Sequence, residues 1–205
     1  LVGTANSLQM SGLRPVVSIP EAVLRLGGNQ ARRNALGFTL LSDNPETTCE
    51  SFDYAEYWLT SLATAVAARL LVEDGELMPP QEAYATGLLS QVGRLALAHV
   101  HPEAYAQVLH DWDGADEGAL LRLEQEAFAL SHNELSASIV STWGLPSICI
   151  EAIRNHHAAS EEPHSAKPRS KTLTDVLWLA RGLSQRCFNE HYDPDRPGVD
   201  WGRIP

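Results

Sequence analysis

The sequence predicts an all-α fold, and three observations carry that prediction. Apolar residues recur at spacings of three and four along almost all of the 205 residues, which is the period of amphipathic helices. Residue pairs spaced as helix-capping boxes occur repeatedly. Alternating runs bounded by turn residues, the signal of strands, are nearly absent, so we expect less than about one residue in twenty in strands.

The first two expected helices are short. Ser18 and Glu21 are spaced as a capping box, and Gly27 ends the helix that follows them. A second helix is expected over residues 30–41, and it stops at the turn residues before Pro45 because proline cannot continue a helix.

The longest expected helix covers residues 51–73. Its predicted apolar stripe, in which small alanines let other helices approach, consists of Phe52, Ala55, Trp58, Leu62, Ala65, Val66 and Leu70. One continuous helix is expected next, over residues 82–98, and its Gly87 and Gly93 each cost about 1 kcal/mol relative to alanine. Two such glycines indicate a close helix crossing.

Further helices are expected in the second half of the chain. Four of them cover residues 102–112, 117–129, 131–143 and 146–157. Residues 158–171 are predicted to be a polar surface loop. A last helix is expected to start at Thr172, which is spaced to form a capping box with Asp175. The predicted organisation is one helical domain over residues 1–188 and an irregular tail over residues 189–205.

Composition and charge exclude several classes of protein. Acidic residues outnumber basic ones by 26 to 15, and the formal net charge of −11 repels phosphate backbones, so no direct nucleic-acid binding is expected. Three cysteines without a paired motif favour a reducing cytoplasm. Every apolar stretch is interrupted before 18 residues, so no membrane segment is expected. The chain starts at Leu1 with neither initiator methionine nor signal peptide, which indicates an excerpt from a longer protein.

Catalytic motifs for nucleotide binding, acyl transfer and zinc proteolysis are missing, so the eight histidines are the remaining candidates for metal or proton chemistry. His110 beside Asp111 is interpreted as a residue that complements a helix end. His99 and His101 are interpreted as capping residues, because no third ligand completes a metal site. His132, His156 and His157 taken singly would also be ordinary surface or core residues.

The order of motifs changes that interpretation, because five elements occur in the order found in one family. They are residues 4–7 (TANS), 18–27 (SIPEAVLRLG), 57–62 (YWLTSL), 83–95 (AYATGLLSQVGRL), and 143–146 (WGLP) followed by Ala152, Ile153, His156 and His157. The chain therefore resembles the bacterial HDOD family, a branch of the HD-domain phosphohydrolase superfamily, from its first residues to about Cys187.

This resemblance implies an HD-domain-like helical bundle. Several helices usually precede the first of these elements in the family, so the N-terminal part of the domain is expected to be missing from this chain. In such a bundle we expect six apolar residues to be buried together, namely Trp58, Leu62, Leu88, Leu95, Val140 and Ile153.

The resemblance also bears on catalysis. Hydrolases of the superfamily bind one or two divalent metals through an early histidine, an adjacent His-Asp pair and a late aspartate, and a metal-bound hydroxide attacks phosphorus. The resemblance equates the early histidine with Thr60 and the pair with Ser90 and Gln91. It equates the late aspartate with Arg181. Hydroxyl and amide groups are poor ligands for a catalytic ion, so the resemblance implies no metal, no cofactor and no catalysis.

Three histidines match family positions and remain. They are expected to bond to neighbouring polar groups or a helix end, or to line a small polar pocket at the degenerate site. The predicted pocket residues are Thr60, Ser90, Gln91, His132, His156, His157 and Arg181.

The implied function is a non-catalytic regulatory module of a bacterial signal-transduction protein, such as a response regulator of a two-component system, acting through protein contact or ligand sensing. Expected partners are other signalling proteins or fused receiver, GGDEF or EAL domains. One alternative is a metal-dependent phosphohydrolase acting on nucleotides, with Glu126, Asp53 or Asp74 as carboxylate partners of the histidines. Another is a structural or homodimerisation domain, supported by the alanine-rich helix over residues 52–73.

Overall fold

The computed structural model describes residues 15–17, 19–26, 49–73, 78–112, 114, 116–157 and 168–188. The helices in these ranges are α2 (Ile19–Leu26), α4 (Tyr54–Glu73), α5 (Pro80–Leu89), α6 (Val92–Val100), α7 (Pro102–Asp111), α8 (Glu117–Phe128), α9 (His132–Thr142), α10 (Ser147–Asn155) and α11 (Pro168–Phe188). No strand occurs in them, which confirms the all-α prediction. The expected helix over residues 30–41, the TANS element and the tail over residues 189–205 lie outside the described residues.

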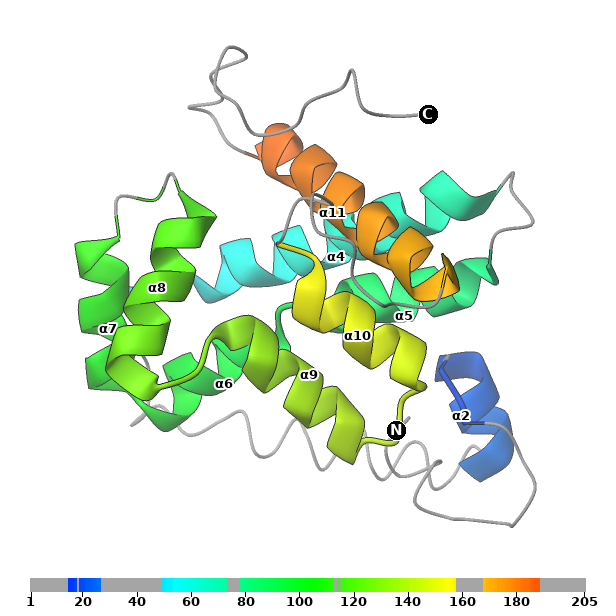
Figure 1. Cartoon of the computed structure of the whole chain (residues 1–205), viewed down its shortest axis with the longest axis horizontal. Coiled ribbons are helices and arrows are strands. Elements are labelled where there is room, and N and C mark those ends of the chain that lie inside the picture. The colour runs from blue at the N-terminus through cyan, green and yellow to red at the C-terminus, as the bar shows by residue number, and fades with distance from the viewer. Residues whose placement is uncertain are drawn as a thin grey trace.

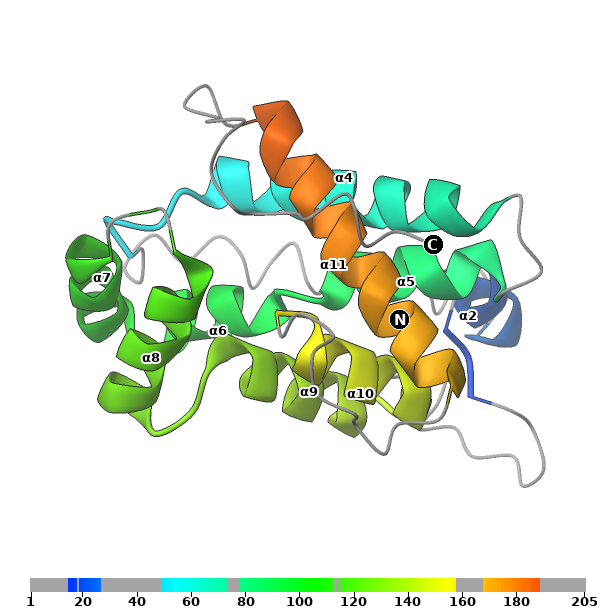
Figure 2. The same ribbon diagram turned by 45° about the horizontal axis from the view of Figure 1, so that its top comes forward.

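Two long helices organise the bundle. α11 crosses α4 and also contacts α5, and α4 packs against α5 along much of its length (Figures 1 and 2). α10 packs between α9 and α11, and α9 packs against α6. α7 and α8 form a helical hairpin at the end of the molecule on the left of Figure 1. Among the described helices, none is both long and apolar enough to cross a membrane.

The apolar core consists of two clusters. The first joins α4, α5, α9, α10 and α11, and its fully buried members include Val140, Ile153 and Leu177. The second joins the start of α4 to α6, α7 and α8 around Tyr105 and Leu120. Polar residues from helices of both clusters meet between them, so the two cores together position the site described below.

Close helix crossings at Gly87 and Gly93 confirm the expectation for these glycines. A Cβ atom at Gly87 would lie 3.0 Å from the Cα atom of Ala65 in α4. A Cβ atom at Gly93 would lie only 2.2 Å from the carbonyl oxygen of His132 in α9. Because real Cβ atoms do not approach so closely, any larger residue at position 93 would push α6 away from α9.

The prediction of one continuous helix over residues 82–98 is wrong. The chain leaves the helix at Ser90 and Gln91, where Gln91 has φ −113° and ψ 17°, and restarts as α6. In a continuous helix the backbone N–H of Gly93 would bond to the carbonyl four residues earlier. Here it donates to Ser136 Oγ at 2.8 Å, so a tertiary contact with α9 replaces the helical bond.

The last helix starts earlier than predicted, at Pro168, so residues 168–171 belong to α11 and not to the expected loop. Proline is suited to the first turn of a helix because its missing N–H would have no helical partner there. Arg169 ties this first turn to α5 through an ion pair with Glu82 at 2.8 Å. The sequence signal at Thr172 therefore lies inside the helix.

The predicted buried stripe over residues 52–70 is wrong for its large residues after Phe52, although Phe52 and Ala65 are buried as expected. Trp58 and Leu62 are 55% and 48% exposed, whereas the buried face carries Tyr57, Ser61, Thr64, Ala65, Ala68 and Val72. Two helices cross α4 closely, and only small side chains fit beneath such crossings, so the large apolar side chains face outward. Of the expected core, Val140 and Ile153 are fully buried, and Leu88 and Leu95 are half-buried.

Candidate functional site

Polar side chains from five segments meet where the two core clusters adjoin. Glu117 begins α8, His132 begins α9, and His157 follows the end of α10. Gln91 lies at the break between α5 and α6, and Arg181 lies in the middle of α11. Helix ends and a helix break thus supply most of the site, and these are places where side chains can turn inward together.

His132 is held by a buried carboxylate. Its Nδ1 atom lies 2.7 Å from Glu124 Oε2, and its backbone N–H donates to the same oxygen at 2.8 Å. Tyr105 donates its hydroxyl hydrogen to Glu124 Oε1 at 3.0 Å. A carboxylate accepts only, so His132 Nδ1 carries the hydrogen and a neutral ring has its lone pair on Nε2. The capping box of Ser131 and Glu134 fixes the helix start that carries His132.

His157 faces His132. The Nε2 atoms of the two rings are 3.2 Å apart, and the ring planes are inclined at 84°. Arg181 Nη1 contacts both ring nitrogens of His157 and lies 3.0 Å from Nδ1. Burial, and next the positive charge of Arg181, hold the pKa of His157 well below its ordinary value. His157 is therefore neutral at physiological pH.

His156 adjoins this pair and is almost completely buried. Its Nδ1 atom lies 2.6 Å from the carbonyl oxygen of Ile153, so Nδ1 carries the hydrogen and donates it. Burial, and next Arg181, lower the pKa of His156 to about 3. Its Nε2 atom has no hydrogen-bond partner within the described structure. The ring is thus a neutral core residue that contacts His157.

Arg181 is the central cation of the cluster. Its side chain is only 6% exposed, and its Nη2 atom contacts Glu117 Oε1. With the Gln91 amide oriented so that its oxygen faces the guanidinium, Gln91 accepts from Nη1 at 2.9 Å and from Nε at 3.1 Å. Burial alone would raise the pKa of Glu117, but Arg181 and next Arg94 outweigh it and lower that pKa to about 2. Glu117 is therefore ionised and paired with Arg181.

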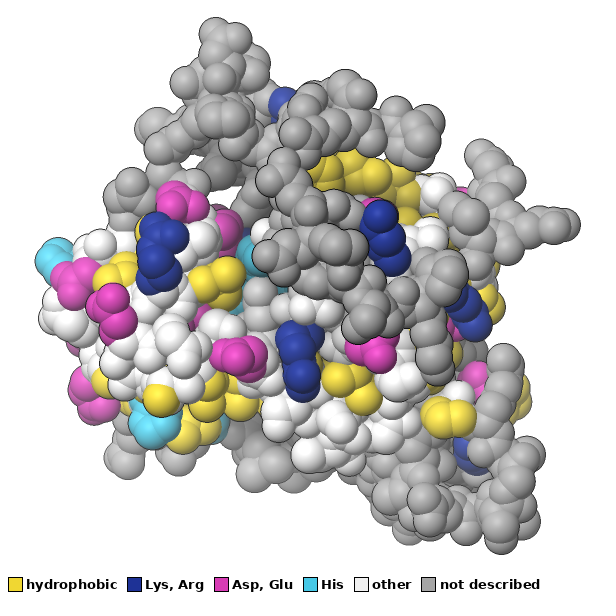
Figure 3. Space-filling model, viewed as in Figure 1, with side chains coloured by type: hydrophobic (Ala, Val, Ile, Leu, Met, Phe, Trp, Pro, Cys, Tyr) yellow, Lys and Arg dark blue, Asp and Glu magenta, His cyan; other side chains and the backbone are white. Residues whose placement is uncertain are grey.

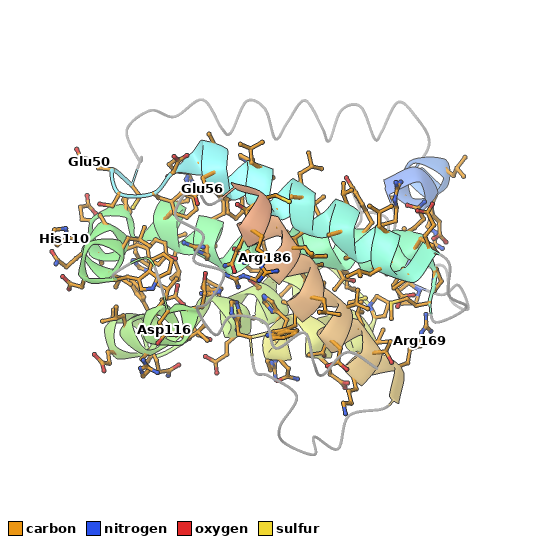
Figure 4. All side chains as sticks on the ribbon, turned by 90° about the horizontal axis from the view of Figure 1, so that it is seen from above. Glu50, Glu56, His110, Asp116, Arg169 and Arg186 are labelled. Carbon is orange, nitrogen blue, oxygen red and sulfur yellow. The ribbon has the colours of Figure 1, made fainter. Side chains whose placement is uncertain are left out.

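Part of the cluster, but none of its histidines, lines a cavity of about 430 Å³. Thr60, Gln91, Glu117 and Arg181 line its interior, together with Arg94, whose guanidinium stacks on Trp112 at 5.6 Å. Asp53 and Glu56 also line it, and Glu56 is labelled near the start of α4 in Figure 4. A polar cavity with both charge signs on its walls can hold water or a small polar ligand.

The residues at the positions that the resemblance equates with metal ligands do not fit a divalent ion. The Ser90 hydroxyl donates to the carbonyl oxygen of Gly87 at 2.8 Å. The backbone carbonyl oxygen of Thr60 accepts from the Ser184 hydroxyl at 3.1 Å. Gln91 faces Arg181, which brings a positive charge to the same place. A different set of three possible ligands, Glu117, His132 and His157, lies with one donor atom each within 4.8 Å of one another.

The structure brings together most of the predicted pocket residues. Gln91, His132, His157 and Arg181 form a contact network, and Thr60 lines the adjoining cavity. His156 packs behind His157. Ser90 is buried but is bonded to the preceding helical turn.

Two residues of the site, Glu117 and Glu124, were not predicted from the sequence. Glu117 falls in the acidic first turn of α8, and Glu124 is two helical turns further on, both in patterns typical of a solvated helix. Of the carboxylates considered from sequence, Glu126 is exposed, Asp53 lines the cavity, and Asp74 lies outside the described residues.

The remaining histidines considered from sequence lie away from the cluster. His99, His101 and His110 are exposed, and Figure 4 shows His110 on the outer side of α7. His101 stacks on Phe128, with ring centroids 5.6 Å apart, and its side chain does not cap the helix that it precedes. The capping interpretation of His101 is therefore wrong, whereas His110 lies in the last turn of α7, as expected.

Charged side chains on the surface are mixed. On the described part of the face shown in Figure 3, acidic side chains lie over α7 and α8, and Lys and Arg side chains are scattered without forming a cluster. No continuous basic stripe of the kind that tracks a phosphate backbone is visible on that face.

Comparisons with known proteins agree with this architecture. The HDOD domain profile matches residues 1–159. The crystal structure of the MmoQ response regulator from Methylococcus capsulatus str. Bath is similar with a TM-score of 0.80 and 35% identity, over 94% of this chain and 74% of that chain. Comparison with curated proteins gave no match.

Two more distant structures share the fold. An HDOD domain protein of unknown function from Geobacter sulfurreducens has a TM-score of 0.57 and 23% identity, over 96% of this chain and 65% of that chain. A proposed phosphohydrolase from Shewanella amazonensis SB2B has a TM-score of 0.56 and 24% identity, over 91% of this chain and 63% of that chain.

Proposed function

The chain belongs to the HDOD domain family, and from that premise we propose that it is a non-catalytic regulatory module of a bacterial signal-transduction protein. Its similarity to a response regulator supports the signalling part of the proposal. Receiver, GGDEF or EAL domains, fused or separate, and other signalling proteins are the proposed partners, and the cytoplasm is the proposed location.

One observation carries the non-catalytic part of the proposal. The guanidinium of Arg181 contacts Glu117 and His157 at the point where the histidines and carboxylates converge. A hydrolytic metal centre needs anionic and imidazole donors that are free to bind the ion and to lower the pKa of its bound water. Here Glu117 is engaged with a cation, and the Gln91 amide is engaged with the same cation.

The charge balance of the cluster supports the same conclusion. Arg181, which is buried, pairs with the partly buried Glu117, and burial and Arg181 together keep His156 and His157 neutral. Adding a divalent ion beside Arg181 would place like charges together in a medium that screens them poorly. A cluster whose charges already balance is suited to a structural or sensing role.

The proposal is tested by metal analysis and turnover measurements on the purified chain. Manganese, iron, nickel and magnesium are added in turn, bound metal is measured, and cyclic dinucleotides, cyclic mononucleotides and a nitrophenyl phosphodiester are assayed. We expect no stoichiometric metal and no turnover above buffer. Stoichiometric metal together with turnover that disappears in His157→Ala would overturn the proposal in favour of a phosphohydrolase.

A second candidate, homodimerisation, is favoured by a row of large apolar side chains on the outer face of α4. The row consists of Trp58, Leu59, Leu62, Val66, Leu70 and Leu71, each between 37% and 55% exposed. Four of them are spaced by four residues, which forms the ridge used in the commonest class of helix packing. Sedimentation of Leu62→Glu against Val100→Glu, an exposed apolar control in α6, tests this candidate. Dissociation by the first change alone would support it, and a wild-type monomer would exclude it.

A further inference from the structure

The cavity beside the cluster has an apolar and a charged part of its wall that lie apart from the histidines. It is bounded by the start of α4, the end of α7, the start of α8 and by α11. Its volume of about 430 Å³ is in the range of pockets that bind small molecules, roughly 300–1,000 Å³. The apolar part of the wall consists of Phe52, Tyr57, Leu109 and Trp112.

Arg94 presents a guanidinium to this cavity without a carboxylate partner. Within the described part of the chain it forms no ion pair, and its Nε atom is a buried donor without an acceptor. The guanidinium carbon lies 5.6 Å from the ring centre of Trp112, and the Tyr105 hydroxyl contacts the guanidinium. The Trp112 indole N–H donates to the carbonyl oxygen of Asp116 at 2.8 Å, which fixes the ring. Arg94 is therefore held in place before any ligand binds.

The buried carboxylates that act on Arg94 are already engaged with other groups. Glu117 pairs with Arg181, and Glu124 accepts from the ring and backbone of His132. The planar fork of guanidinium donors matches the two oxygens of a carboxylate. Arg94 is thus the group on the cavity wall that is best suited to bind a carboxylate of a ligand.

Two exposed carboxylates line the same cavity at its mouth. Asp53 and Glu56 belong to the start of α4, where Figure 4 labels Glu56, and neither forms an ion pair with a described residue. Asp53 Oδ1 accepts from the backbone N–H of Glu56 at 2.8 Å, which holds Asp53 at the helix start. These carboxylates would repel a ligand with a net negative charge, and Arg94 would repel one with a net positive charge. A ligand with one group of each sign satisfies both.

We propose that this cavity binds a small zwitterion, namely an amino acid or a dipeptide with an apolar side chain. The ligand carboxylate pairs with the Arg94 guanidinium, and the ammonium group is directed toward Asp53 and Glu56. The apolar side chain packs against Phe52 and Trp112. The inference deepens the proposed function, on which it rests, because it names the class of ligand that a sensing module would detect.

Calorimetric titration and thermal unfolding of the purified chain test the inference. The probes are leucine, phenylalanine and tryptophan, their glycyl dipeptides, their amides, which lack the carboxylate, and their N-acetyl forms, which lack the ammonium group. We expect a zwitterion to bind at one site per chain and to raise the melting temperature. Its amide and N-acetyl form should bind at least about 10-fold more weakly. Tighter binding of the free amino acid or of the dipeptide identifies the source of the zwitterion.

Two variants with matched controls locate the site. Arg94→Met keeps much of the apolar stem and should weaken zwitterion binding at least about 10-fold, whereas Arg154→Met, at an exposed position of α10, should not weaken it. Circular dichroism establishes that each variant is folded. Glu56→Gln changes an exposed residue, so it remains informative where Arg94→Met is unstable. Glu73→Gln is its exposed control at the other end of α4.

The Glu56 variant has a result of opposite sign for two probes. Glu56→Gln should weaken binding of the zwitterion about 2- to 5-fold and should strengthen binding of its N-acetyl form, because one repelling carboxylate is removed. Glu73→Gln should change neither. The inference is overturned when no zwitterion binds, when the blocked forms bind equally well, or when Glu56→Gln behaves as Glu73→Gln does. Phosphodiester turnover by wild type would instead overturn the proposed function whether or not a zwitterion binds, so the two failures are distinguishable.

Discussion

Glu124 and His132 form a completely buried pair, with His132 Nδ1 2.7 Å from Glu124 Oε2 and neither side chain exposed. Glu124 accepts three hydrogen bonds, from Tyr105 and from the ring and backbone of His132. This carboxylate, which belongs to α8, therefore connects α7 and α9 to its own helix.

Replacing that carboxylate by an amide should destabilise the fold. In Glu124→Gln the amide oxygen can accept from His132 only if the NH₂ group turns toward Tyr105, whose hydroxyl must then accept instead of donating. The bonds to His132 also lose their charged acceptor, so we expect a cost of about 1–3 kcal/mol. Urea unfolding measures the change. Glu126→Gln, an exposed change in the same helix, should alter stability by less than about 0.5 kcal/mol. Equal effects of the two changes would show that Glu124 is not the anchor of His132.

The contact between α6 and α9 predicts a large effect of Gly93→Ala. The new Cβ atom would meet the His132 carbonyl oxygen at 2.2 Å, and backbone atoms must move to admit it. Overpacking of this kind costs about 1–3 kcal/mol. The loss is read from thermal or urea unfolding.

Gly118→Ala is the matched control, because its Cβ atom would meet only the ends of two side chains at the start of α8, Asp116 at 3.1 Å and Arg122 at 3.6 Å. We expect this change to alter stability by less than about 1 kcal/mol. A Gly93→Ala protein as stable as wild type would contradict the close approach of the two helices.

Truncating a buried and an exposed aliphatic side chain to alanine should lower the free energy of unfolding by very different amounts. Ile153 is fully buried in the first core cluster, so Ile153→Ala should lower the free energy of unfolding by about 2–5 kcal/mol. Leu62 is 48% exposed on α4, so Leu62→Ala in a monomer should cost less than about 1 kcal/mol. Urea unfolding at low protein concentration compares them. A larger loss for Leu62 would place the outer face of α4 in the core after all.

Stability should fall as the pH drops below about 6.5. In the folded chain, burial and then Arg181 lower the pKa of His156 to about 3 and that of His157 well below 6.5. The unfolded chain regains ordinary pKa values, so it binds more protons throughout this window, and each histidine contributes a slope of up to about 1.4 kcal/mol per pH unit. The stabilisation is complete above the unfolded pKa of 6.5 and is lost as the pH falls toward the folded values.

Protonation of Glu117 extends the loss of stability to lower pH. Burial raises its pKa, but Arg181 and next Arg94 outweigh this and lower it to about 2, so its contribution is present above 4.5 and lost between 4.5 and 2. Urea unfolding from about pH 8 to about pH 4 measures the histidine window. His156→Gln should reduce the slope of the free energy of unfolding against pH by the contribution of about one proton. His99→Gln, an exposed control, should leave that slope unchanged. Stability that rises on acidification would contradict the assignment.

Much of the fold could be predicted from local signals, and the failures have physical causes. The start of α9 was predicted well because a capping box is a local interaction between Ser131 and Glu134. The break at Gln91 was missed because it depends on a contact between Gly93 and Ser136, which are 43 residues apart. The exposure of Trp58 and Leu62 in α4 was missed because packing there is decided by how closely α5 and α11 approach, which periodicity does not encode.

In the site, too, some residues could be predicted from the sequence and others depend on tertiary contacts. Motif order brought Gln91, His132, His157 and Arg181 into one predicted pocket, and they are in contact. The carboxylates that hold two of these residues were missed, because Glu117 and Glu124 occur in a helix whose sequence is typical of a solvated surface. Only the tertiary arrangement makes them buried partners.

The ion pair between Arg181 and Glu117 constrains which single substitutions the chain can tolerate. Removing one partner of a buried pair costs about 3–5 kcal/mol, a large part of the roughly 5–15 kcal/mol by which a domain is stable. Loss of Arg181 alone would therefore leave a weakened protein unless another cation replaced it. The two positions are therefore constrained as a pair, and a change at either one is expected to be tolerated only together with a compensating change at the other.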